Sequence, residues 1–321
     1  MKGRVCGDFD GASFLKRVED ENLHIYNVRI MRDQKLIFQA DWAPVERRDI
    51  HSVTKTFTST AIGLAREEGI LSLDEYVVDC FADELPAGVP ENLRRMQLLH
   101  LLMMTMGFRE PLLTMEKRPE MRKNVQDWVR YVLSAEVAFA PGECFLYNNA
   151  GSYLLSVLLE RRTGKTVTEY LTPGLFDRIG ITDVRTTEYC PAGHELGASG
   201  MLLNVDELLT FGQLYLQEGS WKGEQLIPRN WIREATSLHA LRKAGHSMKD
   251  VTIQQATTIG AGYGYQLWLG PEAKWYYFIG SYDTMVLILP QKNTVIAVAA
   301  REVAKEGETL KTLVKTVLPK L

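Results

Sequence analysis

The sequence lacks the features of membrane-spanning, secreted and disulfide-stabilised proteins. No apolar run approaches the roughly 18 residues that a membrane-spanning helix needs. The first residues, MKGRVCGDFDG, contain no apolar stretch of the kind found in a secretory signal. The four cysteines are widely separated, with no C-x-x-C pair. Scattered thiols without a signal are typical of a reducing compartment, so we expect a cytoplasmic protein with no membrane span.

Charge and composition argue against nucleic acid and metal ions as partners. The formal net charge is −3, and no stretch combines Lys or Arg with interleaved aromatic residues, so we expect no nucleic-acid partner. The six histidines form no H-E-x-x-H motif, and we expect no metal. A chain of 321 residues, 45% of them hydrophobic, is long enough to bury a large core. The oligomeric state stays open.

Apolar runs at both ends of the chain predict one antiparallel sheet. Leu23–Ile30 and Lys35–Asp41 form a predicted strand pair, because β-branched and apolar residues are interrupted by a short polar turn. Near the C-terminus, four runs rich in β-branched and aromatic residues are broken by Gly, Pro and Asn: YGYQLWLG, KWYYFIG, TMVLILP and NTVIAVAA. We predict that each is one strand of the same sheet.

The middle of the chain has helical periodicity instead. Apolar residues recur at three- and four-residue spacing in four segments of this region: Leu98–Met104, Val125–Leu133, Gly151–Arg162 and Asp206–Gln217. An amphipathic helix is expected at about Glu306–Leu318. The pattern predicts an α+β fold, with a sheet built from both termini and an inserted helical region. We expect residues 1–70 and 218–321 to form the sheet subdomain and residues 71–217 the mainly helical one.

The segment Ser52-Val53-Thr54-Lys55 combines a nucleophile and a possible base. Residues three apart lie on one face of a helix, and apolar positions at Val53, Phe57 and Ala61 predict a helix with a buried side. A lysine amine can accept a serine proton if its surroundings lower its pKa. The alternative is structural: Ser52 or Thr54 caps the helix and Lys55 is solvated. The motif alone does not decide between them.

A second polar cluster, Tyr147-Asn148-Asn149, follows the turn at Pro141-Gly142 and precedes a predicted helix. A tyrosine hydroxyl can carry a proton to a leaving group, and an amide side chain can orient a carbonyl or a lysine. In isolation, a buried tyrosine and an asparagine helix cap explain these residues equally well. The combination of S-x-x-K with P-G-x-x-x-x-Y-x-N about ninety residues later is more specific.

This combination resembles the serine β-lactamase and penicillin-binding protein family, most closely the branch of class C β-lactamases, D-aminopeptidases and family VIII esterases. The resemblance extends from about Leu23 to Val317. It implies a β-lactamase/DD-peptidase-like fold and needs no cofactor. It also implies that Ser52 is the acylated serine, Lys55 its lysine partner, Tyr147 the tyrosine and Asn149 the asparagine of the family.

One family motif is missing. Penicillin-recognising members carry Lys-Thr-Gly or His-Thr-Gly on a strand beside the site, and the corresponding place here is Phe278-Ile279-Gly280. Arg162-Thr163-Gly164 imitates the motif but follows a predicted helix. We expect the backbone at Gly280 and Ser281 to line the oxyanion site, with the Ser281 N–H as a donor. Aromatic residues of the last strands, including Trp268, Trp275 and Phe278, are candidates for the wall of an acyl pocket, and the alternative for most of them is a place in the core of the sheet.

The resemblance therefore implies a serine hydrolase that acts through an acyl-enzyme on a small ester, amide or peptide. One alternative is a β-lactamase or a D-alanyl-D-alanine carboxypeptidase-like enzyme. The missing Lys-Thr-Gly counts against it, because the residues in its place supply no cation and no hydroxyl to pair with a substrate carboxylate. The other is a non-catalytic relative that senses a ligand, which the complete Ser52, Lys55, Tyr147 and Asn149 set counts against.

Overall fold

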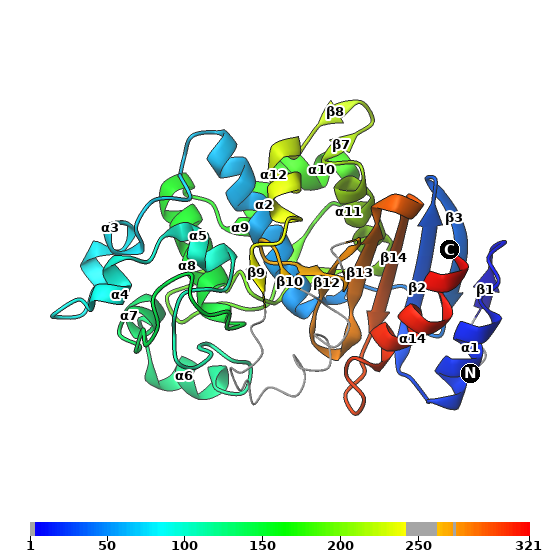
Figure 1. The fold of residues 1–321 in the computed structure, drawn as a ribbon, viewed down its shortest axis with the longest axis horizontal. Helices are drawn as coiled ribbons and strands as arrows, with labels where there is room; N and C mark the ends of the chain where they lie inside the picture. Colours follow the sequence, from blue (N-terminus) through cyan, green and yellow to red (C-terminus); the bar gives the residue numbers. More distant parts are fainter. Residues whose placement is uncertain (1–3, 242–261, 272–273) are drawn as a thin grey trace.

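The computed structural model describes residues 4–241, 262–271 and 274–321. Its largest element is a nine-stranded sheet in which every neighbouring pair is antiparallel (Figure 1). In spatial order its strands are β1 (Arg4–Cys6), β3 (Lys35–Asp41), β2 (Ile25–Arg32), β14 (Thr294–Ala300), β13 (Met285–Leu289), β12 (Tyr276–Ile279), β11 (Trp268–Leu269), β10 (Gly262–Tyr263) and β9 (Ala240–Leu241). The N-terminal strand β2 pairs with the C-terminal strand β14, which confirms that both ends of the chain build one sheet.

The run YGYQLWLG is not the single strand that its composition predicts. It forms two short strands, β10 and β11, joined by a tight turn in which the Gly264 N–H donates to the Leu267 carbonyl over 2.9 Å. Gln266 takes a positive φ of 62° in this turn. Its side chain is buried and bonded to the Ser152 hydroxyl at 2.6 Å, so tertiary contacts hold a conformation that the sequence pattern does not reveal.

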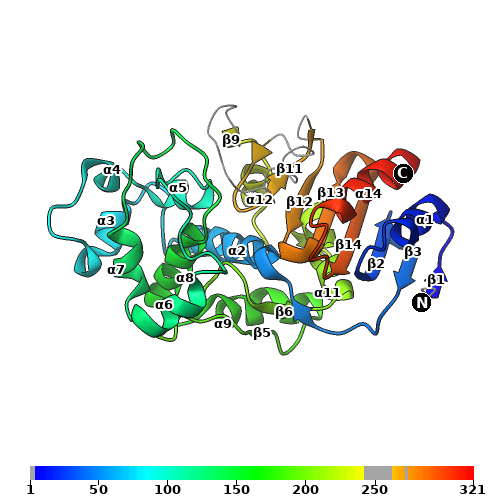
Figure 2. The same cartoon turned by 90° about the horizontal axis from the view of Figure 1, so that it is seen from below.

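Helices cover both faces of the sheet (Figure 2). On one face lies α11 (Val205–Leu216), which packs on β14 and β13. On the other lie α1 (Ala12–Asp20) and α14 (Glu308–Thr316), which contact each other. Because β14 is sandwiched between these layers, all seven of its residues are buried, which explains its nearly continuous apolar sequence. A Cβ at Gly212 of α11 would lie 2.6 Å from the Val295 Cγ1 atom, so glycine is needed for this close approach.

A region of mostly short helices lies beside the sheet, on the left in Figure 1. Its helices are α3 (Val77–Cys80), α4 (Glu91–Arg94), α5 (Leu98–Leu102), α6 (Arg118–Asn124), α7 (Trp128–Leu133), α8 (Asn149–Thr163) and α9 (Val167–Leu171). The short helix α10 (Asp177–Ile179) follows α9 in the chain and lies near α11 (Figure 1). The predicted helices are present. However, α7 begins at Trp128 rather than Val125, because Asp127 caps it by accepting the Arg130 N–H at 2.8 Å. The proposed subdomain boundaries after residues 70 and 217 stay a prediction.

Helix α2 (Thr54–Glu67) runs between the helical region and the sheet (Figures 1 and 2). Most of its side chains are buried, as expected for a helix with neighbours on all sides. It contacts α8 and α9, and on another side Phe57 stacks on Phe211 of α11 with ring centroids 3.9 Å apart. The N-terminus of α2 is therefore fixed where the two regions meet.

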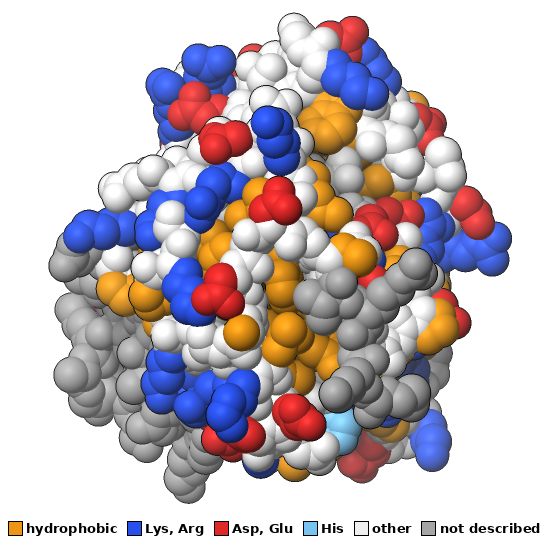
Figure 3. Space-filling model, turned by 90° about the vertical axis from the view of Figure 1, so that its right-hand side faces the viewer, with side chains coloured by type: hydrophobic (Ala, Val, Ile, Leu, Met, Phe, Trp, Pro, Cys, Tyr) orange, Lys and Arg blue, Asp and Glu red, His pale blue; other side chains and the backbone are white. Residues whose placement is uncertain are grey.

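Smaller elements complete the fold. A three-stranded sheet contains β4 (Arg48–Asp49), β6 (Met201–Leu203) and β5 (Arg185–Thr186). A hairpin is formed by β7 (Ser220–Trp221) and β8 (Glu224–Gln225), and α12 (Arg229–Ala235) follows it. Within the described ranges, no helix is both long enough and apolar enough to cross a membrane. On the face shown in Figure 3, basic and acidic side chains are interspersed rather than gathered into one basic surface.

Candidate active site

The candidate nucleophile lies at the entrance to α2. Strand β4 leads into a short 3-10 helix, His51–Val53, which continues directly into α2. His51 has a positive φ of 49°, and its N–H donates to the Asp49 carboxylate at 2.7 Å. The same carboxylate oxygen accepts the Gly200 N–H at 3.1 Å. This turn places Ser52 in the first helical turn, where backbone N–H groups have no intrahelical partner and the helix dipole favours negative charge.

Lys55 is a buried amine beside the serine. Its side chain is 1% exposed, and its Nζ atom lies 2.9 Å from Ser52 Oγ and 2.9 Å from the Ala198 carbonyl oxygen. Burial lowers the pKa of Lys55 well below its ordinary value, and the positive charge of Arg118 lowers it further. The neutral amine is therefore favoured, and it is within hydrogen-bond reach of the hydroxyl whose proton it would accept.

Tyr147 stands on the other side of this pair. The Lys55 Nζ atom is 4.9 Å from the centroid of the Tyr147 ring. The ring stacks on Trp268 with centroids 5.6 Å apart and meets Tyr263 edge-on at 6.2 Å. These aromatic contacts hold the ring against β10 and β11, across the site from α2.

Asn149 and its neighbour Asn148 hold one wall of the site. Asn148 caps α8 by accepting the Ala150 N–H at 3.0 Å, and the same oxygen accepts the Leu112 N–H at 3.0 Å. The Asn149 amide donates to the Leu113 carbonyl at 2.8 Å. Both asparagines thus attach the loop at Leu112 to the start of α8. The Lys55 amine, which we expected Asn149 to position, is held by Ser52 and Ala198 instead.

The end of β12 approaches the nucleophile backbone closely. A Cβ at Gly280 would lie 2.3 Å from the Ile50 carbonyl oxygen and 3.0 Å from the Ser52 amide nitrogen, so only glycine fits without displacing backbone. The next residue, Ser281, opens a short turn that contains Tyr282 and Asp283, with φ of 64° and 68°. The Asp283 carboxylate accepts the N–H groups of Gly307 and Thr309 at 2.6 and 3.0 Å, which anchors the turn to the start of α14.

These segments enclose one cavity of about 240 Å³. Its lining includes five of the predicted site residues: Ser52, Tyr147, Asn149, Gly280 and Ser281. Trp268, Ile279 and Met115 are apolar members of its wall, and Glu116, Asp283 and Glu306 are acidic ones. No grouping of three His, Cys, Asp or Glu side chains suited to a metal occurs among the residues that the structure describes.

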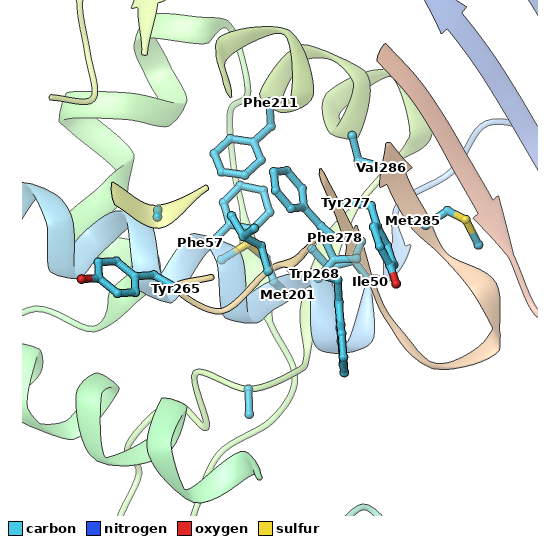
Figure 4. Close-up of a cluster of buried hydrophobic side chains, with 14 of the residues drawn as sticks. Ile50, Phe57, Met201, Phe211, Tyr265, Trp268, Tyr277, Phe278, Met285 and Val286 are labelled. Carbon is cyan, nitrogen blue, oxygen red and sulfur yellow. The ribbon is translucent and has the colours of Figure 1, made fainter. Parts of the chain in front are cut away.

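Two of the aromatic candidates for the wall of an acyl pocket, Trp275 and Phe278, do not line this cavity. Phe278 is buried on the opposite face of β12, where its ring contacts Phe211 and Tyr215 of α11 at centroid distances of 5.8 and 5.0 Å (Figure 4). Trp275 packs on Tyr277, 5.2 Å away, near the start of the strand. Because side chains alternate along a strand, the assignment of Phe278 to the pocket is wrong, and Ile279 is the β12 side chain at the cavity.

Arg162-Thr163-Gly164 lies away from the cavity, as its position after a predicted helix indicates. Gly164 ends α8 in the left-handed conformation, with a φ of 69°. Arg162 pairs with Glu75 at 2.5 Å and donates to the Ile70 carbonyl at 2.9 Å. These residues therefore stabilise the helical region.

The sequence gives no role to Arg118 or to the segment 197–201. Arg118 begins α6, and its side chain is 4% exposed, with Nη1 2.9 Å from Ser199 Oγ. The segment supplies the Ala198 carbonyl to Lys55, and Thr58 of α2 bonds to its Gly197 carbonyl at 2.7 Å. No local motif marks either feature, since both depend on contacts between residues about eighty or more positions apart.

Comparisons with known proteins agree with the fold. The sequence profile of the Beta-lactamase family matches residues 17–316. Protein flp of Staphylococcus aureus (strain COL) is 25% identical over 130 residues, which are 40% of this chain and 26% of that protein. The match thus spans only about a quarter of the length of this curated relative.

Three solved structures share the fold at low identity. A candidate 6-aminohexanoate-dimer hydrolase from Bacillus anthracis has a TM-score of 0.78 and 18% identity, covering 95% of this chain and 80% of that one. The octameric penicillin-binding protein homologue from Pyrococcus abyssi has a TM-score of 0.74 and 18% identity, with 97% and 77% covered. A penicillin-binding protein from Bacillus halodurans has a TM-score of 0.70 and 20% identity, covering 95% of this chain and 100% of that one. The profile match over nearly the whole chain decides the assignment: the protein belongs to the beta-lactamase family.

Proposed function

We propose that the protein is a serine hydrolase that forms an acyl-enzyme at Ser52 and cleaves small esters or amides. The observation that carries the proposal is the buried Lys55 amine, 2.9 Å from Ser52 Oγ, in surroundings that favour its neutral form. A purely structural lysine would gain nothing from being desolvated beside a second cation. Ser52 also lines a cavity rather than lying in packed core.

In the first step, Ser52 Oγ attacks the substrate carbonyl carbon while its proton passes to Lys55 Nζ. The tetrahedral intermediate collapses when the bond to the leaving group breaks and a proton is delivered to the leaving atom. Tyr147, whose ring adjoins the amine, is suited to pass this proton on. Water then attacks the acyl-enzyme by the same route in reverse, which releases the acid and restores Ser52.

The developing oxyanion would be bound by backbone N–H groups. Ser52 N–H is in the first turn of a helix, and Ser281 N–H follows Gly280, whose Cα lies against the Ser52 backbone. Two such donors on opposite elements can point at one oxygen. Removal of one oxyanion donor costs about 3–4 kcal/mol in well-studied hydrolases, so this arrangement is a large part of the proposed catalysis.

The cavity walls favour a small substrate that has no carboxylate where the family's Lys-Thr-Gly motif would bind one. The cavity of about 240 Å³ is below the usual range of about 300–1,000 Å³ for ligand pockets. At the end of β12 it presents Ile279 and Gly280, where a carboxylate-reading relative would place a threonine and a glycine after a cation. An unpaired substrate carboxylate would lose a charge-assisted hydrogen bond of about 1.5–3 kcal/mol.

We therefore expect kcat/KM for p-nitrophenyl butyrate to exceed that for a chromogenic cephalosporin by about a hundredfold or more, since the lost contacts together amount to about 3 kcal/mol. Mono-p-nitrophenyl succinate is the matched control, because it keeps the leaving group and adds one carboxylate. It should be a poorer substrate than the butyrate. A cephalosporin value equal to the ester value would indicate that another cation, such as Lys274 or Arg301, binds the carboxylate.

Replacing Gly280 with alanine is expected to lower kcat about a hundredfold. The new Cβ would collide with backbone atoms of Ile50 and Ser52, and a displacement of about 1 Å at a reacting group can cost that much. Gly174→Ala is the control, because a Cβ there meets nothing within 4 Å. Steady-state kinetics on the butyrate ester measure both. Full activity in Gly280→Ala would show that the end of β12 does not set the oxyanion geometry.

A further inference from the structure

A buried cation shares the back wall of the site with Lys55. Arg118 Nη1 donates to Ser199 Oγ at 2.9 Å, and Lys55 Nζ lies 2.9 Å from the Ala198 carbonyl oxygen. Ala198 and Ser199 are consecutive, so the two side chains approach neighbouring residues of one segment. Consecutive Cα atoms are about 3.8 Å apart, which brings both positive groups into the same small volume. Two buried cations on one segment disfavour each other's charged form.

Arg118 is the cation that keeps its charge. A guanidinium has an ordinary pKa above about 12, and although burial lowers the pKa of Arg118, it starts well above a lysine. Glu188 adds a compensating charge, with its Oε2 atom 3.2 Å from Arg118 Nη1. For Lys55, by contrast, burial and the Arg118 charge are the two causes that lower its pKa, and no carboxylate among the residues that the structure describes offsets them.

Ion pairing alone does not account for this arginine. Glu188 is already paired with Arg122, one turn further along α6, so its charge is compensated without Arg118. The Arg118 Nε atom is buried and has no hydrogen-bond partner within the described ranges. Arg118 therefore places beside Lys55 a positive charge that Glu188 does not need for its own compensation.

We propose that Arg118 is a positioning residue of the candidate active site, whose buried positive charge keeps the Lys55 amine in the neutral form that accepts the Ser52 proton. The inference rests on the proposed function and adds a residue that acts through Lys55. The other charged or titratable groups around Arg118 are Asp49, Glu116, Arg122 and Glu188. Burial lowers the pKa of His51, and the positive charges of Arg118 and Arg301 lower it further.

The test is the rate at which a fluorophosphonate labels Ser52, measured against pH. In this step the Oγ–P bond forms, the P–F bond breaks, fluoride leaves and the proton goes to Lys55, so no natural substrate is needed. Without the Arg118 charge, protonated Lys55 persists to higher pH. We expect Arg118→Met to label about tenfold more slowly near pH 7, because a larger share of Lys55 is protonated there when the Arg118 charge is absent. The rate should recover toward the wild-type value at higher pH.

Three variants separate charge from structure. Arg118→Gln keeps a donor for Ser199 Oγ but no charge, so it should behave like Arg118→Met. Arg118→Lys keeps a basic group opposite Glu188 and should recover more of the labelling rate near pH 7 than either neutral variant. Arg122→Met is the matched control, because it removes the other partner of Glu188 and should leave the pH dependence in place.

The outcomes are distinct. A loss of rate that is the same at every pH, an unchanged rate, or unfolding of both neutral variants would overturn the inference and assign Arg118 a structural role. Absence of Ser52 labelling in the wild-type protein at any pH would instead overturn the proposed function. The two failures can therefore be told apart in one experiment.

Discussion

Replacing Ser52 with alanine is expected to abolish hydrolysis, with a loss in kcat of at least about a thousandfold and as much as about a millionfold, the scale found when a serine nucleophile is removed. Ser52 Oγ is the hydroxyl next to the buried Lys55 amine, and alanine leaves no atom to carry the acyl group. Because the change removes one partly exposed oxygen, the melting temperature should stay within a few degrees.

Ser59→Ala is a matched control for this prediction. Ser59 is on the same helix, fully buried, and its hydroxyl has no hydrogen-bond partner in the part of the chain that the structure describes. Its loss should leave kcat for the butyrate ester unchanged. Undiminished hydrolysis by Ser52→Ala would contradict the assignment of Ser52 as the nucleophile.

Removing either proton carrier is expected to cost about a hundredfold or more in kcat, the usual scale for general acid–base groups. Lys55→Met tests the amine and fills its buried space, and Tyr147→Phe removes only the hydroxyl. If the two groups serve one proton path, the double variant should lose much less than the product of the single losses. Fully additive losses would show that they act separately.

The buried amine of Lys55 determines in which direction kcat changes with pH. Lys55 must be neutral to accept a proton, so wild-type kcat should rise with pH as the amine deprotonates, and Lys55→Met should lack that rise. Stability gives a second readout. The pKa of Lys55 is lower in the folded protein than in the unfolded chain, so the unfolded state binds more protons and stability increases with pH. Lys55→Met removes this cost and should melt at an equal or higher temperature near pH 7.

The parts of the site that could be predicted from sequence are local. Ser52 and Lys55 are three residues apart, so helix geometry alone brings them together. Tyr147 and Asn149 flank a helix start that is recognisable from its turn and its periodicity. The structure places Ser52, Tyr147 and Asn149 around one cavity and Lys55 beside Ser52. Their chemical roles stay predictions.

The parts that could not be predicted depend on burial from two sides. Strand β12 is covered on both faces, so Tyr276, Tyr277 and Phe278 are all buried and composition does not reveal which side chain faces the cavity. The hairpin of β10 and β11 was hidden for a similar reason, because Gln266 turns the chain while it is buried in contacts to α5 and α8. Short edge strands such as β1 and β9 have too few residues for a periodic signal.

Helix α1 is not among the predicted helices, although its sequence has the periodicity of a helix. Phe14 and Val18 are one turn apart and are the buried residues of this nine-residue helix, which is the spacing of an amphipathic helix. By contrast, Arg118 carries no local sign of its burial. An arginine at a helix start resembles any exposed arginine until Ser199 and Glu188 are placed around it.

Mass spectrometry of the intact protein after reaction with a fluorophosphonate shows whether Ser52 is a working nucleophile, and it needs no known substrate. We expect a mass increase of one phosphonyl group, mapped by peptide sequencing to Ser52, and no label in Ser52→Ala. The same label should form much more slowly in Lys55→Met. An unlabelled wild-type protein, or a label on another residue, would contradict the claim that Ser52 and Lys55 form a working nucleophile.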